Sequence, residues 1–207
     1  MNDMKKMIKD AAVLLVITVM AGLILGFVYQ ITKEPIAAAK EKAAKEAYQE
    51  VFPDASDFSA PLELAAPEGD TTWDTNYKNV DLGSVLEAVD EGGNVLGYVL
   101  TVTSHEGYGG DITFAMGIQK DGTLNGISIL SISETAGLGM KAESVLKPQF
   151  ENKKVANFTY TKSGSTMDSQ IDAISGATIT TNAVTTVVNA GLYVFQTQLG
   201  GSSYEAE

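Results

Sequence analysis

The residues with the clearest potential for covalent chemistry lie near the C-terminus, in the segment "DAISGATITT" that begins at Asp172. Three small residues leave the hydroxyl of Thr178 accessible to a modifying enzyme: Ser175, Gly176 and Ala177. The residues just after Thr178 are predicted to open a helix, whose free N–H groups and positive dipole end favour a phosphate. A phosphate esterified to Thr178 would therefore lie in a favourable field, and Asp172 would orient the segment or assist its modification. The residues alone support an N-capping turn equally well, because Ser and Thr form such turns without a ligand.

Two glycine-rich segments earlier in the chain are candidates for contact with a ligand. The first, "SHEGYGGDI", begins at Ser104, and its glycines allow close approach of the backbone: Gly107, Gly109 and Gly110. Its aromatic residue, Tyr108, can pack on a flat ring. The alternative is an ordinary loop between two hairpins, in which His105 is a surface residue rather than a proton carrier.

The second segment, "SETAGLGMK", begins at Ser133 and follows the predicted strand "GISILSI". Glycines at the end of a strand admit a ligand, but this segment lacks the GxGxxG spacing and the strand–helix–strand setting of a dinucleotide site. A tight turn is the alternative, with Glu134 capping the helix that follows. A phosphate-binding P-loop is excluded, because the sequence contains no GxxxxGK(S/T) pattern.

Composition narrows the classes of function. Lys and Arg total 14 against 26 for Asp and Glu, which gives a formal net charge of -12. Nucleic-acid binding is therefore not expected, because it requires a basic face. The chain has no cysteine and one histidine, so iron–sulfur ligation, thiol chemistry and zinc sites built from Cys and His are not expected either. Any redox role would need a bound organic cofactor.

An uncharged segment from Ala11 to Ile31 predicts a membrane anchor. A helix needs about 20 residues to cross a hydrocarbon core of roughly 30 Å. Lys5, Lys6 and Lys9 precede the segment, so the positive-inside rule places the N-terminus in the cytoplasm and the main domain outside, with the lipid bilayer as a partner. The alternative is a cleaved signal peptide, although the apolar region of a signal peptide is usually shorter.

Four parts are predicted along the chain: a transmembrane anchor at 1–33, a helical stalk at 34–52, an extracytoplasmic domain at 53–200 and a polar tail at 201–207. The stalk is rich in Ala, Glu and Lys, which favour helix, and Pro35 fits its first turn.

Two hairpins are predicted in the extracytoplasmic domain. The first has a strand that ends near Val89, the turn "DEGGN" and a strand from Val95 to Thr103, and the second repeats this form around "KDGT". A short helix is predicted from Lys141 to Lys147. Apolar spacing predicts a long helix from Thr181 to Leu199, capped by Thr180 or by its own first residue.

The remaining segments are predicted to be mostly irregular. The segment "FPDASDFSAPLELAAPEGDTTW" contains three prolines, and "KKVANFTYTKSGS" is predicted to be a loop with an edge strand. The predicted fold class is α+β, with an antiparallel sheet and helices packed on it.

Taken together, these motifs resemble a known family. "DAISGAT" resembles the flavinylation motif D-(g/s)-x-(s/t)-(s/g)-A-T, whose final Thr, here Thr178, carries FMN through a phosphoester. The anchor followed by "GYGGDI", a hairpin with "DG", "SETAGLG" and "SGAT" resembles the G-type subunit of the Rnf electron transport complex over most of the chain. It is also similar to the C-type subunit of the sodium-pumping NADH:quinone reductase. Two positions depart from the family pattern: Ala136 replaces the proline of ETPGLG, and Ala173 replaces a Gly or Ser.

The resemblance implies a membrane-anchored flavoprotein that relays electrons through covalent FMN, in a complex that couples ferredoxin:NAD⁺ electron transfer to ion movement. It implies a redox subunit of a translocase in the cell (inner) membrane, rather than an independent catalyst. The implied partners are the other membrane subunits and a flavin transferase that uses FAD as donor. The residues expected around the flavin are Asp172, Ser175, Gly176, Ala177, Thr178, Glu134, Thr135, Gly137, Leu138, Gly139, Gly107, Tyr108 and Gly109.

Other functions are compatible with the same residues. One is a standalone extracytoplasmic FMN-binding protein that transfers electrons, and another is the C-type subunit of the sodium-pumping reductase. A third, from a different class, is a structural or sensory membrane-anchored domain without a cofactor. In that domain Thr178 would be unmodified, and the glycines would serve only turns.

Overall fold

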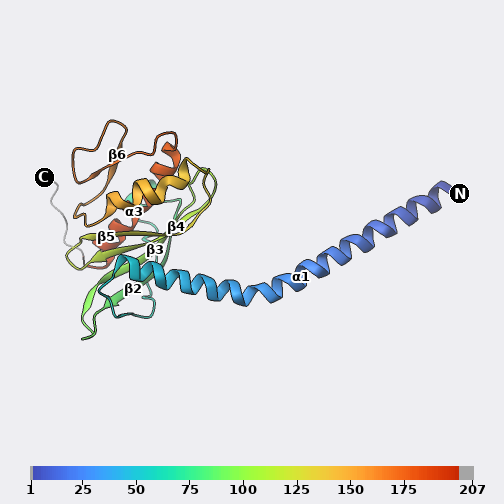
Figure 1. Cartoon of the computed structure of the whole chain (residues 1–207), viewed down its shortest axis with the longest axis horizontal. Helices are drawn as coiled ribbons and strands as arrows, with labels where there is room; N and C mark the ends of the chain where they lie inside the picture. Colours follow the sequence, from blue (N-terminus) through green and yellow to red (C-terminus); the bar gives the residue numbers. More distant parts are fainter. Residues whose placement is uncertain (1, 201–207) are drawn as a thin grey trace. The chain divides into compact units, whose positions relative to one another are not determined.

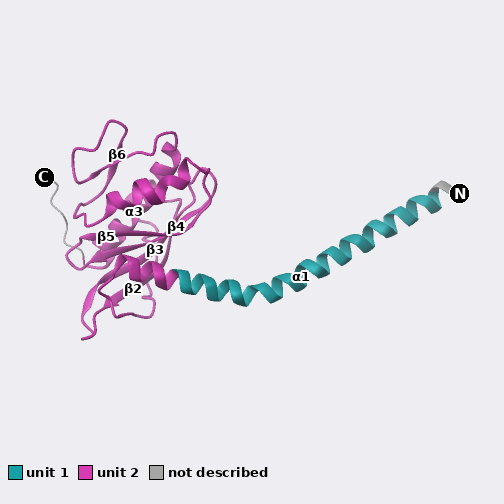
Figure 2. Ribbon diagram, viewed as in Figure 1, with its two compact units in different colours: residues 1–43 teal, residues 44–207 magenta. Residues whose placement is uncertain are grey.

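The structure is a computed structural model that describes residues 2–200, and it divides into two compact units, residues 1–43 and 44–207 (Figure 2). Helix α1 runs from Asn2 to Val51 without interruption. It contains a window with a mean hydropathy of 2.8, none of it buried within the structure, and is long and apolar enough to cross a membrane. The expected helix start at Pro35 is not seen, because Pro35 lies inside α1. A proline removes one N–H donor and fixes φ near the helical value, so a single one does not have to end a helix.

A five-stranded antiparallel sheet forms the centre of the second unit, in the order β1-β2-β3-β4-β5 (Figure 1). The strands are β1 (Asp57–Phe58), β2 (Val80–Val89), β3 (Val95–Ser104), β4 (Ile112–Gln119) and β5 (Leu124–Ile132). The two predicted hairpins, β2–β3 and β4–β5, are confirmed. Each turn is fixed by an aspartate: Asp90 Oδ1 accepts from the N–H of Asn94 at 2.8 Å, and Asp121 Oδ1 from that of Thr123 at 2.9 Å.

Helix α3 (Thr178–Gln198) packs on one face of this sheet (Figure 1). Leu100, Phe114 and Met116 point toward it and are fully buried. The predicted long helix is thus confirmed, but it starts three residues earlier than expected. The predicted cap is wrong, since Thr180 lies inside the helix and the N-cap is Ala177, which makes no side-chain cap bond.

The shorter elements differ more from expectation. The irregular segment after α1 contains helix α2 (Thr71–Asn76), which begins where Asp70 Oδ1 accepts from the N–H groups of Thr72 and Trp73. In place of one short helix, three turns follow one another: η1 (Gly139–Lys141), η2 (Ala142–Leu146) and η3 (Lys147–Phe150). The predicted edge strand, β6 (Thr159–Thr161), pairs in parallel with β7 (Gln170–Asp172) in a small second sheet. The α+β fold class is confirmed.

The C-terminal end of α1 packs on the other face of the sheet. Successive residues of a strand point to opposite faces, so Val99 and Ala115 face away from α3 and are buried against Val51 and Phe52. The Glu50 carboxylate accepts from Ser128 Oγ and pairs with Lys147 Nζ. Side-chain and backbone bonds therefore fix the end of α1 to the domain.

Glycine at position 97 makes this packing possible. A Cβ at Gly97 would lie 2.3 Å from the carbonyl oxygen of Ile118 and 2.7 Å from the ring of Phe52. Real Cβ atoms do not approach a backbone oxygen so closely, so the strand or the helix end would have to shift.

We expect Gly97→Ala to lower the free energy of unfolding of the domain by about 1–3 kcal/mol, the usual cost of overpacking. Thermal melting of the full-length chain in detergent, followed by far-UV circular dichroism, measures the change. Gly26→Ala is the matched control, because an added Cβ there meets nothing within 4 Å. Equal melting temperatures for the two variants would contradict the packing described.

Candidate functional site

A cavity of ≈ 490 Å³ opens where three segments of the domain meet: the loop between β3 and β4, the segment after β5, and the start of α3. Cavities of this size hold drug-sized ligands and cofactors. Its lining comprises Tyr108, Glu134, Thr135, Leu138, Gly139, Gly176, Ala177, Thr178, Ile179 and Thr180. The structure thus brings together most of the residues that the three sequence motifs singled out.

Thr178 is the first residue of α3 and is half-buried at the wall of this cavity. The body of the helix is packed in the core, so the position of its first turn is fixed by burial rather than by a cap. The backbone N–H of Thr181 is the first to bond within the helix, to the carbonyl of Ala177 at 3.0 Å. The N–H groups before it have no intrahelical partner, which makes this end suited to an anion.

The turn that leads into α3 requires glycine at position 176. Gly176 has φ +80, a left-handed conformation that residues with a Cβ rarely adopt, and a Cβ there would lie 3.1 Å from Leu138 Cδ2. Thr181 Oγ1 stabilises the turn from inside, accepting from the N–H of Ile174 at 3.1 Å and donating to the carbonyl of Ala177 at 2.9 Å. Ser175, just before Gly176, is exposed and is not part of the lining.

Asp172 lies outside the cavity lining. Its carboxylate accepts from the backbone N–H of Ser165 at 2.7 Å, and its backbone N–H donates to Gln149 Oε1 at 2.6 Å. These bonds shape the loop between β6 and β7. A contact between Asp172 and a ligand stays a prediction.

The glycine-rich loop after β3 is held against the end of β5. The N–H of Tyr108 donates to Glu134 Oε1 at 2.8 Å, so the carboxylate binds this loop instead of capping a helix. A Cβ at Gly107 would lie 2.1 Å from the carbonyl oxygen of Gly110, and one at Gly109 would lie 2.0 Å from that of Ser133. These glycines therefore serve the close packing of the loop, which places Tyr108 at the cavity.

The segment after β5 contributes the floor of the cavity. Gly137, at φ +77, forms a turn in which the N–H groups of Leu138 and Met140 both donate to the carbonyl of Thr135, at 3.1 and 3.3 Å. Gly137 itself is not in the lining. Gly139 is buried, and a Cβ there would lie 2.7 Å from Glu134 Cβ. Glycine at position 139 therefore allows this segment to pack closely against Glu134 and Thr180 at the wall of the cavity.

The rim of the cavity is apolar and exposed. Beyond helix α1, the exposed large hydrophobic residues among residues 52–200 are Tyr108, Leu138, Met140, Met167 and Ile179. Three of them line the cavity and Met140 adjoins it. Such a rim suits a flat, largely apolar ring, while the open start of α3 suits a phosphate. Within residues 2–200, no group of three or more His, Asp or Glu side chains is arranged to hold a metal ion.

The size of the cavity, its apolar rim and the open start of α3 suit a flat cofactor that carries a phosphate. The sequence model of the family described as FMN-binding domain matches residues 107–193, which include all three segments of the site. The model described as RnfG N-terminal region matches residues 1–51, a range that contains helix α1. The chain is thus an FMN-binding domain protein with an N-terminal helix.

Relatives define the family more closely. The chain is 32% identical, over 94% of both chains, to the G-type subunit of the Na(+)-translocating ferredoxin:NAD(+) oxidoreductase complex of Acetobacterium woodii. It is also 32% identical to the G-type subunit of the ion-translocating oxidoreductase complex of Methanosarcina acetivorans, over 97% of this chain and 100% of the relative. The chain belongs to the RnfG family. Among solved structures, NqrC of Shewanella oneidensis aligns with a TM-score of 0.46 at 20% identity over 70% of each chain.

Two lining residues were not predicted from the sequence: Ile179 and Thr180. The sequence predicted a helix that starts at Thr181, so both residues were expected in the turn before it. Once the helix starts at Thr178, both belong to its first turn and lie beside the hydroxyl. The role of the lining residues as flavin contacts stays a prediction.

We expect Gly139→Val to weaken the binding of free FMN by about tenfold or more, which is a loss of about 1.4 kcal/mol, because the added side chain would overlap Glu134 and Thr180 and displace these two lining residues. Quenching of FMN fluorescence, titrated with the full-length chain made without a flavin transferase, measures the affinity. Ala136→Val is the control, since Ala136 is exposed in the same segment. An unchanged affinity for Gly139→Val would show that the cavity is not the FMN site.

Proposed function

We propose that the protein is the membrane-anchored flavoprotein subunit of an Rnf-type complex. It relays electrons through FMN during ferredoxin:NAD⁺ electron transfer coupled to ion translocation. The observation that carries the proposal is the place of Thr178: it lines a cavity with an apolar rim and is the first residue of a helix without a side-chain cap. Family membership over almost the whole chain supports the same function.

The FMN is attached covalently to Thr178 in this proposal. A separate flavin transferase uses FAD as donor. The Thr178 Oγ forms a bond to the phosphorus nearer the riboflavin, the pyrophosphate bond of FAD breaks, and AMP leaves while the hydroxyl proton goes to solvent. Thr178 is suited to this step because it is half-buried rather than fully buried, and exposed residues flank it at Ser175 and Ile179.

Each part of the cavity then has a role toward the cofactor. The free N–H groups at the start of α3 stabilise the phosphate, whose negative charge faces the positive end of the helix dipole. Tyr108, Leu138 and Ile179 cover the apolar faces of the ring, and Glu134 holds Tyr108 in place through its backbone N–H. FMN, when bound, accepts and donates electrons, which no side chain of this protein does.

The membrane arrangement is also part of the proposal. Residues 1–33 cross the bilayer, 34–52 form a helical stalk, 53–200 form the extracytoplasmic domain, and 201–207, which lie outside the described residues, form a polar tail. The basic residues before the apolar segment support a cytoplasmic N-terminus in the cell membrane. Covalent attachment suits this location, because an FMN that dissociated outside the cytoplasm would be lost. The partners are the other membrane subunits of the complex, and the protein has no turnover of its own.

We expect covalent flavin to be lost in Thr178→Val and retained in Thr180→Val. Both changes remove a hydroxyl and keep the shape of the side chain, but Thr180 is only 1% exposed and cannot be reached by a transferase. In-gel flavin fluorescence of the denatured full-length protein, co-expressed with a flavin transferase, gives the readout.

Two further variants control the experiment. Thr178→Ser keeps a hydroxyl at the site and is expected to recover part of the fluorescence, whereas Ser175→Ala removes the exposed hydroxyl nearest to it along the chain and is expected to leave the fluorescence unchanged. A fluorescent band in Thr178→Val, or a dark wild type beside a fluorescent known substrate of the same transferase, would contradict attachment at Thr178.

A further inference from the structure

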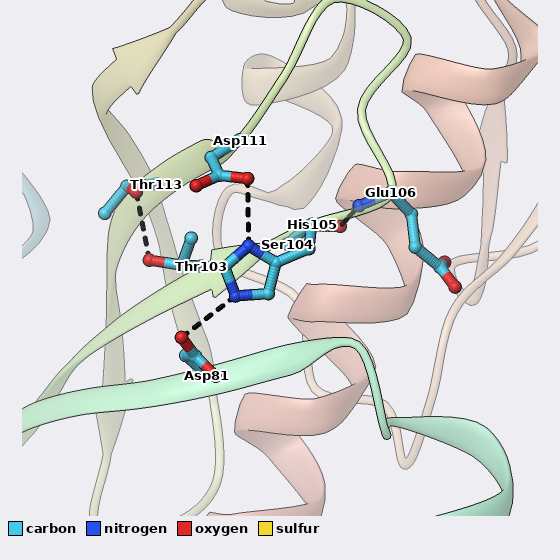
Figure 3. Close-up of polar contacts among 7 residues, drawn as sticks. All are labelled: Asp81, Thr103, Ser104, His105, Glu106, Asp111 and Thr113. Carbon is cyan, nitrogen blue, oxygen red and sulfur yellow. Dashed lines mark hydrogen bonds and ion pairs between the residues drawn. The ribbon is translucent and has the colours of Figure 1, made fainter.

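The only histidine of the chain lies where the two ends of the glycine-rich loop come together, at a place that we call the neck of the loop. His105 follows the last residue of β3, and Asp111 precedes the first residue of β4. His105 Nδ1 is 2.8 Å from Asp111 Oδ1, and Nε2 is 2.9 Å from Asp81 Oδ2 on β2 (Figure 3). The ring thus connects the two ends of the loop to each other and to a neighbouring strand.

The geometry determines the protonation state of His105. A neutral imidazole carries one N–H, and an ionised carboxylate only accepts hydrogen bonds. Both contacts can therefore be hydrogen bonds only when His105 is an imidazolium and donates from both nitrogens. The hydrogen bond to Asp111, and next that to Asp81, raise the pKa of His105 above its ordinary value. The third nearby carboxylate, Glu106, points away from the ring and accepts from Asn79 Nδ2 at 2.8 Å (Figure 3).

The loop between His105 and Asp111 contains Tyr108, which lines the cavity. The base of the loop is also tied to the start of β2, since the N–H of His105 donates to the carbonyl of Asn79 at 3.0 Å. The top of the loop has the bond from Tyr108 to Glu134, and the Tyr108 side chain is 70% exposed. Three of the loop's residues are glycines, which lose the most conformational freedom on ordering. A tie at the neck reduces the freedom of such a loop most effectively.

We propose that His105 is a positioning residue. In its doubly protonated form it joins Asp81 to Asp111, closes the neck of the loop and holds Tyr108 at the flavin cavity. When His105 loses its proton, one of the two contacts is lost and the loop loosens. The inference goes beyond the proposed function and rests on it only in taking the cavity as the FMN site.

The direction of the pH dependence follows from the raised pKa. His105 is protonated in both the folded and the unfolded chain below about pH 6.5, the ordinary value for histidine, so there the tie is complete. As pH rises through the folded pKa, the proton leaves and the part of the stabilisation that depends on the second hydrogen bond is lost. A domain outside the cytoplasm would therefore hold Tyr108 more firmly in an acidic medium than in an alkaline one.

The single histidine makes the first test unambiguous. Full-length protein with ¹⁵N-labelled histidine, purified through a tag without histidine, gives one imidazole to titrate by NMR. Both ring nitrogens are expected to be protonated at pH 6.5, with a pKa above that of free histidine. Asp81→Asn and Asp111→Asn are each expected to lower the pKa, and the double variant to return it close to the ordinary value. A wild-type pKa at or below about 6.5 would overturn the proposal.

The second test follows the loop itself. Hydrogen exchange of the peptide around Tyr108, corrected for the intrinsic pH dependence of exchange, is expected to speed up about threefold or more from a pH below the His105 pKa measured by NMR to a pH above it, as one charge-assisted hydrogen bond is lost. In His105→Gln it is expected to be fast at both pH values. Glu91→Gln, an exposed change in the turn between β2 and β3, is the control and should behave as the wild type. A wild-type loop without a pH step would overturn the proposal.

These tests distinguish a failure of the role proposed for His105 from a failure of the proposed function. The contacts of His105 belong to the chain, so the exchange step is expected both with and without FMN on Thr178. A flavinylated protein without the step would sink the role of His105 alone, and a protein with the step but no flavin would sink the FMN assignment alone. In the flavinylated chain, flavin fluorescence is expected to change between the same two pH values in the wild type and to stay constant in His105→Gln.

Discussion

The burial of helix α3 against the sheet is the constraint on which the site depends. Val184, Val187 and Val188 are fully buried in the same core cluster as Phe114 and Met116, so the helix cannot slide or rotate without opening the core. Its first residue is therefore fixed in space although no side chain caps it. The free N–H groups at this uncapped end are locally unfavourable. A bound phosphate would accept hydrogen bonds from them, and its negative charge would oppose the helix dipole. In the proposed function, this uncapped end is where the phosphate of the cofactor would bind.

The other two walls of the cavity depend on close contacts between backbones. Gly107, Gly109 and Gly139 each occupy a place where a Cβ would come within 3 Å of another residue. The loop that contains Gly107 and Gly109 has little conformational freedom when its two ends are held together, and much more when they are not. The carboxylates of Glu134 and Asp111 hold this loop from two sides, one at its top and one at its neck. Two of the chain's many carboxylates thus stabilise the loop beside the cavity.

Features determined by local pattern could be predicted from the sequence. The alternation of apolar residues up to Val89 and from Val95 indicated the first hairpin, and helical spacing after Thr181 indicated most of α3. The small residues before Thr178 indicated an accessible hydroxyl. Three motifs far apart in the sequence were expected around one ligand because of a resemblance, and the fold does place them around one cavity.

Features determined by tertiary packing could not be predicted. The parallel pairing of β6 with β7 joins short segments with no periodic signal. Glu134 could equally cap a helix or bind a loop, and only the fold brings the N–H of Tyr108 to it. His105 gave no signal in sequence, because its partner Asp81 is 24 residues away and reaches it only through the pairing of β2 with β3. Asp70 before Thr71 was a usable signal for α2, since aspartate is a favoured N-cap.

Peptide mass spectrometry of the full-length chain, matured with a flavin transferase, would locate the cofactor. Lys162 is the last basic residue, so trypsin releases residues 163–207 as one peptide that contains every hydroxyl of the motif. We expect this peptide to gain the mass of one FMN less one water, with fragment ions that assign the addition to Thr178. An unmodified peptide from a flavinylated preparation, or fragments that assign the flavin to Ser175 or Thr180, would contradict covalent attachment of the cofactor to Thr178.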